Sequence, residues 1–159
     1  AALVHARDAV PDMAAVLFGA GPRPSDLPTW IEYRQDPPQS DLVREIYNGS
    51  SIYLCPSHAE GWHLPPAEAM ACGVAVVSTA IDGVADYAID GETALLSPVR
   101  DPEGLAGNLI RLLLDEPTRV SLARAGHRHI QQFSWASSPA ALESALAVPD
   151  RAVAEPVPR

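Results

Sequence analysis

The sequence contains no lysine, and all eleven of its basic residues are arginines. The chain therefore cannot form a Schiff base through a lysine amine, and it lacks the lysine of a P-loop. Twenty acidic residues against eleven basic ones give a formal net charge of −9. A chain with this charge is a poor candidate for binding nucleic acid or an anionic membrane surface.

Cysteine and long apolar runs are also scarce. Cys55 and Cys72 have no Cys-x-x-Cys spacing and lie in apolar segments, so we expect buried free thiols in a reducing compartment. No apolar run approaches the roughly eighteen residues needed to span a bilayer, and residues 1–10 lack the layout of a signal peptide. With 159 residues, 47% hydrophobic and 19% charged, the composition excludes a disordered chain and fits one domain with a sizeable core.

Short apolar runs closed by glycine or proline predict buried strands, and helical patterns lie between them. Because strand, helix and strand follow in turn, we expect a parallel sheet covered on both faces, a doubly wound α/β fold. The expected strands are residues 14–18, 30–34, 51–55, 74–78 and 93–96. The expected helices are residues 1–10, 41–48 after a Ser40 cap, 65–73, 101–115, 118–132 and 135–146. We expect residues 1–147 to form the domain and residues 148–159, with three prolines, to be a disordered tail.

Sheets of this kind bind ligands at the carboxyl ends of their strands. Three loops are expected to meet there, at residues 19–22, 56–64 and 78–83. Glu60 lies in the second loop, and Glu68 follows in the first turn of the next helix, so both carboxylates are expected to face one crevice. Backbone N–H groups at that helix start favour a phosphate, and carboxylates beside it would suit the hydroxyls of a sugar or ribose. The alternative is that the two glutamates only compensate the helix dipole or are solvated.

The stretch PSHAEGWHLPPAEAMACGVAVV at residues 56–77 resembles a known signature, P-S-x-x-E-G-F-G-L-P-x-x-E-A-M-A-x-G-x-P-V-V. That signature is typical of retaining glycosyltransferases of the GT-B fold, family four type (glycosyl transferases group 1). The resemblance extends over about residues 10–146, from LFGAGP to a final F-S-W. It implies the C-terminal, donor-binding half of a GT-B fold, a Rossmann-like domain whose first strand is missing here.

The resemblance also implies roles for individual residues. Glu68 would bind the ribose hydroxyls of the nucleotide, and Glu60 would be the catalytic carboxylate that contacts the donor sugar near the reacting carbon. The base would stack near Tyr33, Arg34 and Gln35. The backbone amides that would hold the sugar and diphosphate belong to Gly61, Trp62, His63 and Leu64.

The activity implied is transfer of a hexose from a nucleotide-diphosphate sugar to an acceptor with retention of configuration, in polysaccharide biosynthesis. No metal and no other cofactor is expected. The enzyme would be cytoplasmic, or peripheral at the membrane through an acceptor-binding N-terminal domain that is missing from this chain.

Two departures from the family pattern bear on donor binding. His63 replaces the second glycine of the signature, where a side chain could crowd the diphosphate or donate a hydrogen bond to it. The family's first strand and its loop with an Arg and a Lys are absent, so we expect this chain to be a fragment that is inactive alone. The same absence favours an alternative, a non-catalytic nucleotide-binding or assembly module. A receiver or flavodoxin-like domain also fits the layout but does not explain the paired glutamates.

Overall fold

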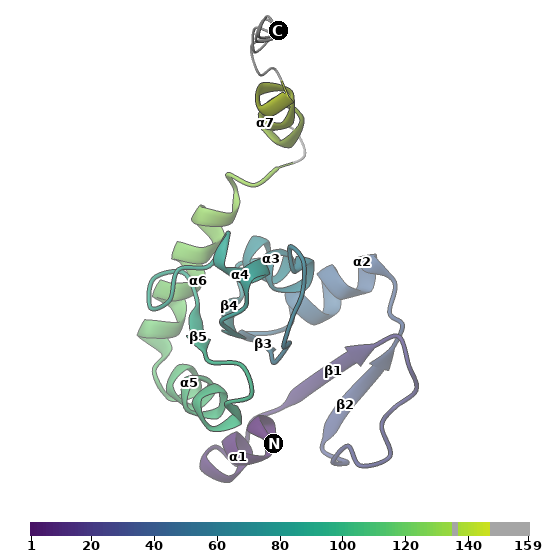
Figure 1. Cartoon of the computed structure of the whole chain (residues 1–159). Helices are drawn as coiled ribbons and strands as arrows, with labels where there is room; N and C mark the ends of the chain where they lie inside the picture. Colours follow the sequence, from purple (N-terminus) through teal and green to yellow (C-terminus); the bar gives the residue numbers. More distant parts are fainter. Residues whose placement is uncertain (135–136, 147–159) are drawn as a thin grey trace, which may run out of the picture.

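Five parallel strands form two sheets in the computed structural model, which describes residues 1–134 and 137–146: β1 Ala15–Gly19, β2 Ile31–Gln35, β3 Ile52–Cys55, β4 Ala75–Thr79 and β5 Leu95–Ser97. One sheet has the order β1-β2 and the other the order β3-β4-β5, and every neighbouring pair is parallel. Figure 1 shows the β1–β2 pair set apart from the other three strands. The predicted parallel α/β architecture is confirmed.

The helices that connect and cover these strands are α1 Ala2–Ala9, α2 Gln39–Asp41, the π-helix η1 Leu42–Tyr47, α3 Leu64–Ala71, α4 Asp82–Ala85, α5 Pro102–Leu114, α6 Glu116–Ile130 and α7 Ser137–Leu146. Prolines and side-chain caps explain two of the helix starts. Asp101 accepts a hydrogen bond from the N–H of Gly104 at 2.8 Å, and Asp115 accepts one from the N–H of Thr118 at 3.0 Å.

Alternate strand residues pack against different helices, which makes the fold doubly wound. On one face, Ile52 and Leu54 of β3 pack with α1 and α5, around Ala6 and Leu109. On the other face, Tyr53 of β3 joins the cluster formed by η1 and α3. Both faces of β3 are therefore covered by helices, as expected for strands whose residues are apolar in succession.

The segment before β3 departs from the sequence-based prediction. The helix begins at Gln39, because the carbonyl of Pro38 accepts the N–H groups of Asp41 and Leu42 at 2.9 and 3.1 Å. Ser40 therefore lies inside the first turn and is not the cap. From Leu42 onward the helix is wider, and the N–H of Asn48 donates to the carbonyl of Val43, five residues earlier, at 3.1 Å.

Smaller differences occur elsewhere. The stretch after β4, where no helix is predicted, contains the short helix α4, and the last strand is shifted to Leu95–Ser97. The expected helix at 135–146 is described from Ser137 onward. Its first two residues and the predicted tail, residues 148–159, lie outside the described part of the chain.

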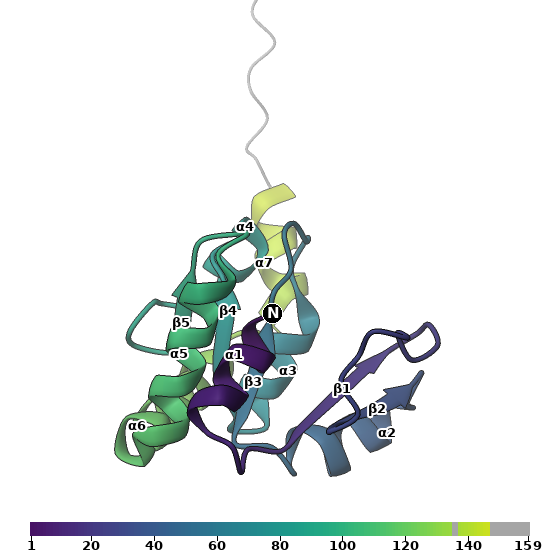
Figure 2. The same cartoon turned by 90° about the horizontal axis from the view of Figure 1, so that it is seen from below.

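A cleft of about 1160 Å³ lies between the two sheets. Its walls include residues 15–18 of β1, residues 52–55 of β3 and residues 1–3 at the start of α1. Among the described residues β1 pairs only with β2, and β3 only with β4, so one backbone edge of each strand has no neighbouring strand. Figure 2 gives a second view of this separation. Each of these edges could pair with a further strand.

Candidate functional site

The loop at residues 56–63 leaves the carboxyl end of β3 and is held by the end of β4 and the segment that follows it. The hydroxyl of Thr79 donates a hydrogen bond to the carbonyl of Ser57. The backbone of Gly83 lies so close to the same loop that only glycine fits at this position. An added Cβ would stand 1.4 Å from the carbonyl oxygen of Gly61. Of the three loops predicted to meet, at residues 19–22, 56–64 and 78–83, the second and third are therefore in contact.

Glu60 lies on the exposed side of this loop. Its carboxylate accepts a hydrogen bond from the hydroxyl of Ser57 at 3.1 Å, and the side chain is 43% exposed. The same oxygen lies 3.9 Å from Nε2 of His63. Glu60 is thus oriented by a neighbour in its own loop while remaining accessible to a ligand.

Glu68 lies in the second turn of α3, since that helix begins at Leu64, and not in the first turn as expected from the sequence. Its two carboxylate oxygens have different donors. Gln39 donates to Oε1 at 3.0 Å through its side-chain amide, and Tyr47 donates to Oε2 at 3.1 Å through its hydroxyl. Both donors belong to the α2–η1 segment, and sequence reasoning did not connect either of them with the site.

The start of α3 offers fewer backbone donors than expected. Pro65 and Pro66 have no N–H group, and the N–H of His63 donates to the carbonyl of Gly61 at 3.0 Å. The backbone donor that remains in this turn is the N–H of Leu64. A phosphate bound here would consequently need donors from elsewhere in addition to the helix terminus.

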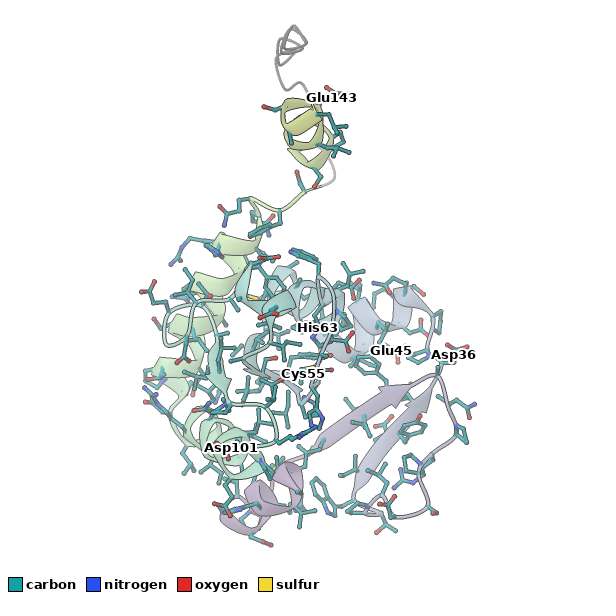
Figure 3. The ribbon with its side chains drawn as sticks, viewed as in Figure 1. Asp36, Glu45, Cys55, His63, Asp101 and Glu143 are labelled. Carbon is teal, nitrogen blue, oxygen red and sulfur yellow. The ribbon has the colours of Figure 1, made fainter. Side chains whose placement is uncertain are left out.

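His63 turns its side chain into the protein. The side chain is 7% exposed, and its ring nitrogens lie 3.6 and 3.7 Å from Sγ of Cys55 (Figure 3). Its carbonyl accepts a hydrogen bond from the hydroxyl of Tyr87 at 2.8 Å. Burial lowers the pKa of His63, although the charge of Glu60 opposes this shift, and burial raises the pKa of the Cys55 thiol. In this orientation the imidazole does not extend into the solvent above the loop.

Trp62 forms an aromatic wall beside the loop. Its ring centroid lies 5.0 Å from that of Tyr87 and 5.7 Å from that of Phe133. The Trp62 side chain is 38% exposed, so one part packs and another faces solvent.

Tyr33 and Arg34, the residues expected near the base, lie on β2. The hydroxyl of Tyr33 donates to the carbonyl of Gly21 at 2.6 Å, which ties β2 to the loop after β1. Arg34 forms ion pairs with Glu32 and, at 3.3 Å, with Glu45. These carboxylates, Glu32 more than Glu45, raise the pKa of the Arg34 guanidinium and balance its charge.

The described part of the chain has no group of three His, Cys, Asp or Glu side chains that could hold a metal ion. Of the helices in residues 1–134 and 137–146, none combines the length and apolar character needed to cross a membrane.

Comparison with known proteins identifies one family. The profile of the family described as "Glycosyl transferases group 1" matches residues 7–129. A similar relative is the D-inositol 3-phosphate glycosyltransferase of Corynebacterium aurimucosum, 40% identical over 117 residues, which are 74% of this chain and 28% of that protein. The chain thus spans about a quarter of the length of the curated relatives it matches.

Solved structures of the same architecture are similar over most of the chain. Sucrose-phosphate synthase from Thermosynechococcus elongatus has a TM-score of 0.77 at 26% identity, over 91% of this chain and 40% of that one. The C-terminal domain of a glycosyl transferase group 1 family protein from Francisella tularensis has a TM-score of 0.70 at 26% identity, over 82% and 76%. Anabaena HepE in complex with UDP-glucose shares the fold, with a TM-score of 0.75 at 16% identity over 90% and 44%.

Proposed function

Because the chain belongs to the glycosyl transferases group 1, we propose that it is the donor-binding part of a glycosyltransferase that uses a nucleotide-diphosphate sugar. We also propose the finer features that the signature implies: a hexose donor, retention of configuration, no metal cofactor, and a cytoplasmic role in polysaccharide biosynthesis. The observation that carries the proposal is the placement of Glu60 and Glu68, an accessible carboxylate on the loop after β3 and an oriented one on α3.

The roles proposed for the two carboxylates follow from the charges in the reaction. Bond cleavage leaves negative charge on the diphosphate and develops positive charge on the sugar. Glu60, exposed on the loop, is suited to the hydroxyls of the sugar, where its interaction can strengthen as positive charge develops. Glu68 is suited to the ribose, a part of the donor that the reaction leaves unchanged.

The diphosphate needs a positive charge that residues 56–71 and Arg34 supply poorly. The bases in residues 56–71 are His58 and His63, and His63 is buried with a lowered pKa. Arg34 is paired with two carboxylates. We therefore propose that a cationic group from outside the chain completes the donor site, and that a separate N-terminal domain brings the acceptor.

Nucleotide binding by the full chain tests the proposal. We expect UDP and UDP-glucose, titrated by NMR, to shift the signals of residues 56–68, and Glu68→Gln to weaken UDP binding roughly tenfold or more, since a hydrogen bond to a charged group contributes about 1.5–3 kcal/mol. Glu116→Gln is the matched control, because Glu116 is exposed at the start of α6 and belongs to no part of the site. Equal UDP affinity in the two variants would contradict the assignment of Glu68.

A second candidate function is a non-catalytic nucleotide-binding or assembly module. The pairing of Arg34 with Glu32 and Glu45 and the burial of His63 favour it, because such a module need not stabilise a leaving diphosphate. Supplying the chain with an acceptor-binding N-terminal domain separates the two functions. Sugar transfer by that combination supports the enzyme, and nucleotide binding without transfer supports the module.

A further inference from the structure

The carboxylate of Glu68 is held between one buried donor and one exposed donor. Tyr47 donates to Oε2 from inside the protein, where it is 1% exposed, and Gln39 donates to Oε1 from the surface. We infer that Tyr47 is a positioning residue that sets the orientation of Glu68, and that Gln39 is a replaceable donor marking the place of the ribose hydroxyls. This inference rests on the proposed binding of ribose by Glu68.

The position of the Tyr47 hydroxyl is fixed by the packing of its ring. The ring meets Phe18 edge-on at 6.2 Å between centroids and Tyr53 at 5.8 Å. Tyr47 is the last residue of η1, and η1 packs against α3. A ring enclosed in this way cannot follow a moving carboxylate, so the carboxylate has to adopt the orientation that the hydroxyl allows.

The Tyr47 hydroxyl also remains a donor over the whole physiological pH range. Burial raises the pKa of Tyr47 far above its usual value, and the neighbouring charge of Glu68 raises it further. A protonated phenol beside a carboxylate donates its proton into the hydrogen bond. Oε2 is therefore occupied, and Oε1 is the oxygen that remains for a ligand.

Gln39, in contrast, donates to Oε1 of Glu68 from an exposed position. It is the first residue of α2, and its side chain is exposed. A hydrogen bond at such a site exchanges readily with water, because both partners can be solvated without loss. Ribose hydroxyls can replace the amide in the same way and would then donate to an oxygen whose direction Tyr47 has already set.

Titration of the full chain with UDP and with 2′,3′-dideoxy-UDP tests the inference. Tyr47→Phe should weaken binding of UDP roughly three- to tenfold, the size of one hydrogen bond's net contribution, and leave binding of the dideoxy compound unchanged. Gln39→Ala should bind UDP as well as the wild type or more tightly. Tyr53→Phe is the matched control, because Tyr53 belongs to the same aromatic cluster and should lose affinity for neither compound.

The outcomes separate this inference from the proposed function. If the wild type binds both compounds equally, or neither, the proposed ribose contact of Glu68 fails and the inference fails with it. If the wild type prefers UDP but Tyr47→Phe matches it for both compounds, only the positioning role of Tyr47 is overturned. Weaker UDP binding by Gln39→Ala would overturn the replaceable role of Gln39.

Glu68→Asp gives a second test that leaves the aromatic cluster intact. The shorter side chain keeps the charge but withdraws it from the Tyr47 hydroxyl. We expect the same selective loss of UDP affinity as in Tyr47→Phe, and wild-type affinity for UDP in this variant would overturn the inference even if Tyr47→Phe failed to fold.

Discussion

Gly83 and Gly61 meet backbone to backbone, so that an added Cβ on Gly83 would stand 1.4 Å from the carbonyl oxygen of Gly61 and 3.1 Å from that of Glu60. The contact lies between the segment after β4 and the loop after β3. The position of the Glu60 carboxylate therefore depends on Gly83, although Gly83 makes no hydrogen bond to that carboxylate. The shape of the site thus depends on a residue more than twenty positions away in the sequence.

Gly83→Ala should therefore displace the loop and impair the site. A methyl group placed against a carbonyl forces the backbone to move, and such overpacking costs about 1–3 kcal/mol. We expect a lower melting temperature, and a UDP-glucose affinity that falls by more than the loss of folded protein explains. Thermal denaturation and calorimetric titration measure the two effects.

Gly107→Ala provides the contrast for Gly83. Gly107 is an exposed residue inside α5 with nothing within 4 Å of an added Cβ. Alanine is favoured over glycine in a helix by roughly 1 kcal/mol, so this variant should melt at a higher temperature and bind UDP-glucose like the wild type. A Gly83→Ala protein that behaves like Gly107→Ala would show that the loop tolerates displacement.

Glu60 and Glu68 should have separable effects on kinetics in the complete enzyme. The proposed ribose contact of Glu68 is the same in the ground state and the transition state, so Glu68→Gln should mainly raise the KM for the donor, roughly ten- to a hundredfold. The proposed sugar contact of Glu60 strengthens as charge develops, so Glu60→Gln should mainly lower kcat by a similar factor. Steady-state kinetics with varied donor measures both constants.

The same two variants also test the plain alternative, in which the glutamates only favour the helix start or are solvated. That reading requires a small loss of melting temperature and unchanged kinetics for both proteins. Glu116→Gln is the reference for an exposed glutamate at a helix start whose loss has only this effect.

His63 should make the stability of the chain sensitive to mild acid. Burial lowers its pKa in the folded state, so between that value and the ordinary value of about 6.5 the unfolded chain binds a proton that the folded chain does not. The free energy of unfolding should therefore fall as the pH is lowered through about 6.5, and level off below the folded-state pKa. Measuring the melting temperature between pH 8 and pH 5 tests this dependence.

Replacing His63 by glutamine should flatten that profile, whereas His58→Gln, at an exposed position in the same loop, should leave it as in the wild type. The inward orientation also changes what the imidazole can do for binding. A tightening of UDP binding on acidification that vanishes in the His63 variant would mean that the side chain turns outward when the ligand arrives.

The sequence supports the fold and the position of the loop at 56–63 better than the details of the site. Apolar runs at 14–18, 51–55 and 74–78 identify buried parallel strands because such strands are covered on both faces. In the sequence, Gly83 is only the last residue of the predicted loop at 78–83. Its close approach to Gly61 depends on how two loops meet in space, and periodicity carries no information about that.

The side-chain partners in the site were less predictable. Tyr47 falls within the helix predicted at residues 41–48, but the direction of its hydroxyl depends on the wider π-helical turn of η1. The orientation of His63 was also open, since its inward turn requires the space beside Cys55 at the end of β3. Both details are set by packing between elements that are distant in the sequence.

The chain alone should bind nucleotide diphosphates weakly and should not transfer sugar. The net charge of −9 repels a diphosphate, and Arg34, which is expected beside the base, is paired with Glu32 and Glu45. Pro65 and Pro66 also remove backbone donors from the start of α3. We expect a dissociation constant in the high micromolar range or weaker, which corresponds to a binding free energy on the order of −5 kcal/mol. Calorimetry with UDP measures it, and submicromolar binding would contradict the proposed need for an outside cation.

Affinity should rise when an N-terminal segment that adds a strand and a basic loop is supplied, because the strand can pair with the open edges of β1 and β3 along the cleft. Hydrogen exchange separates the two contributions: the strand should protect amides of β1 and β3, while only a segment that keeps its basic residues should also tighten UDP binding.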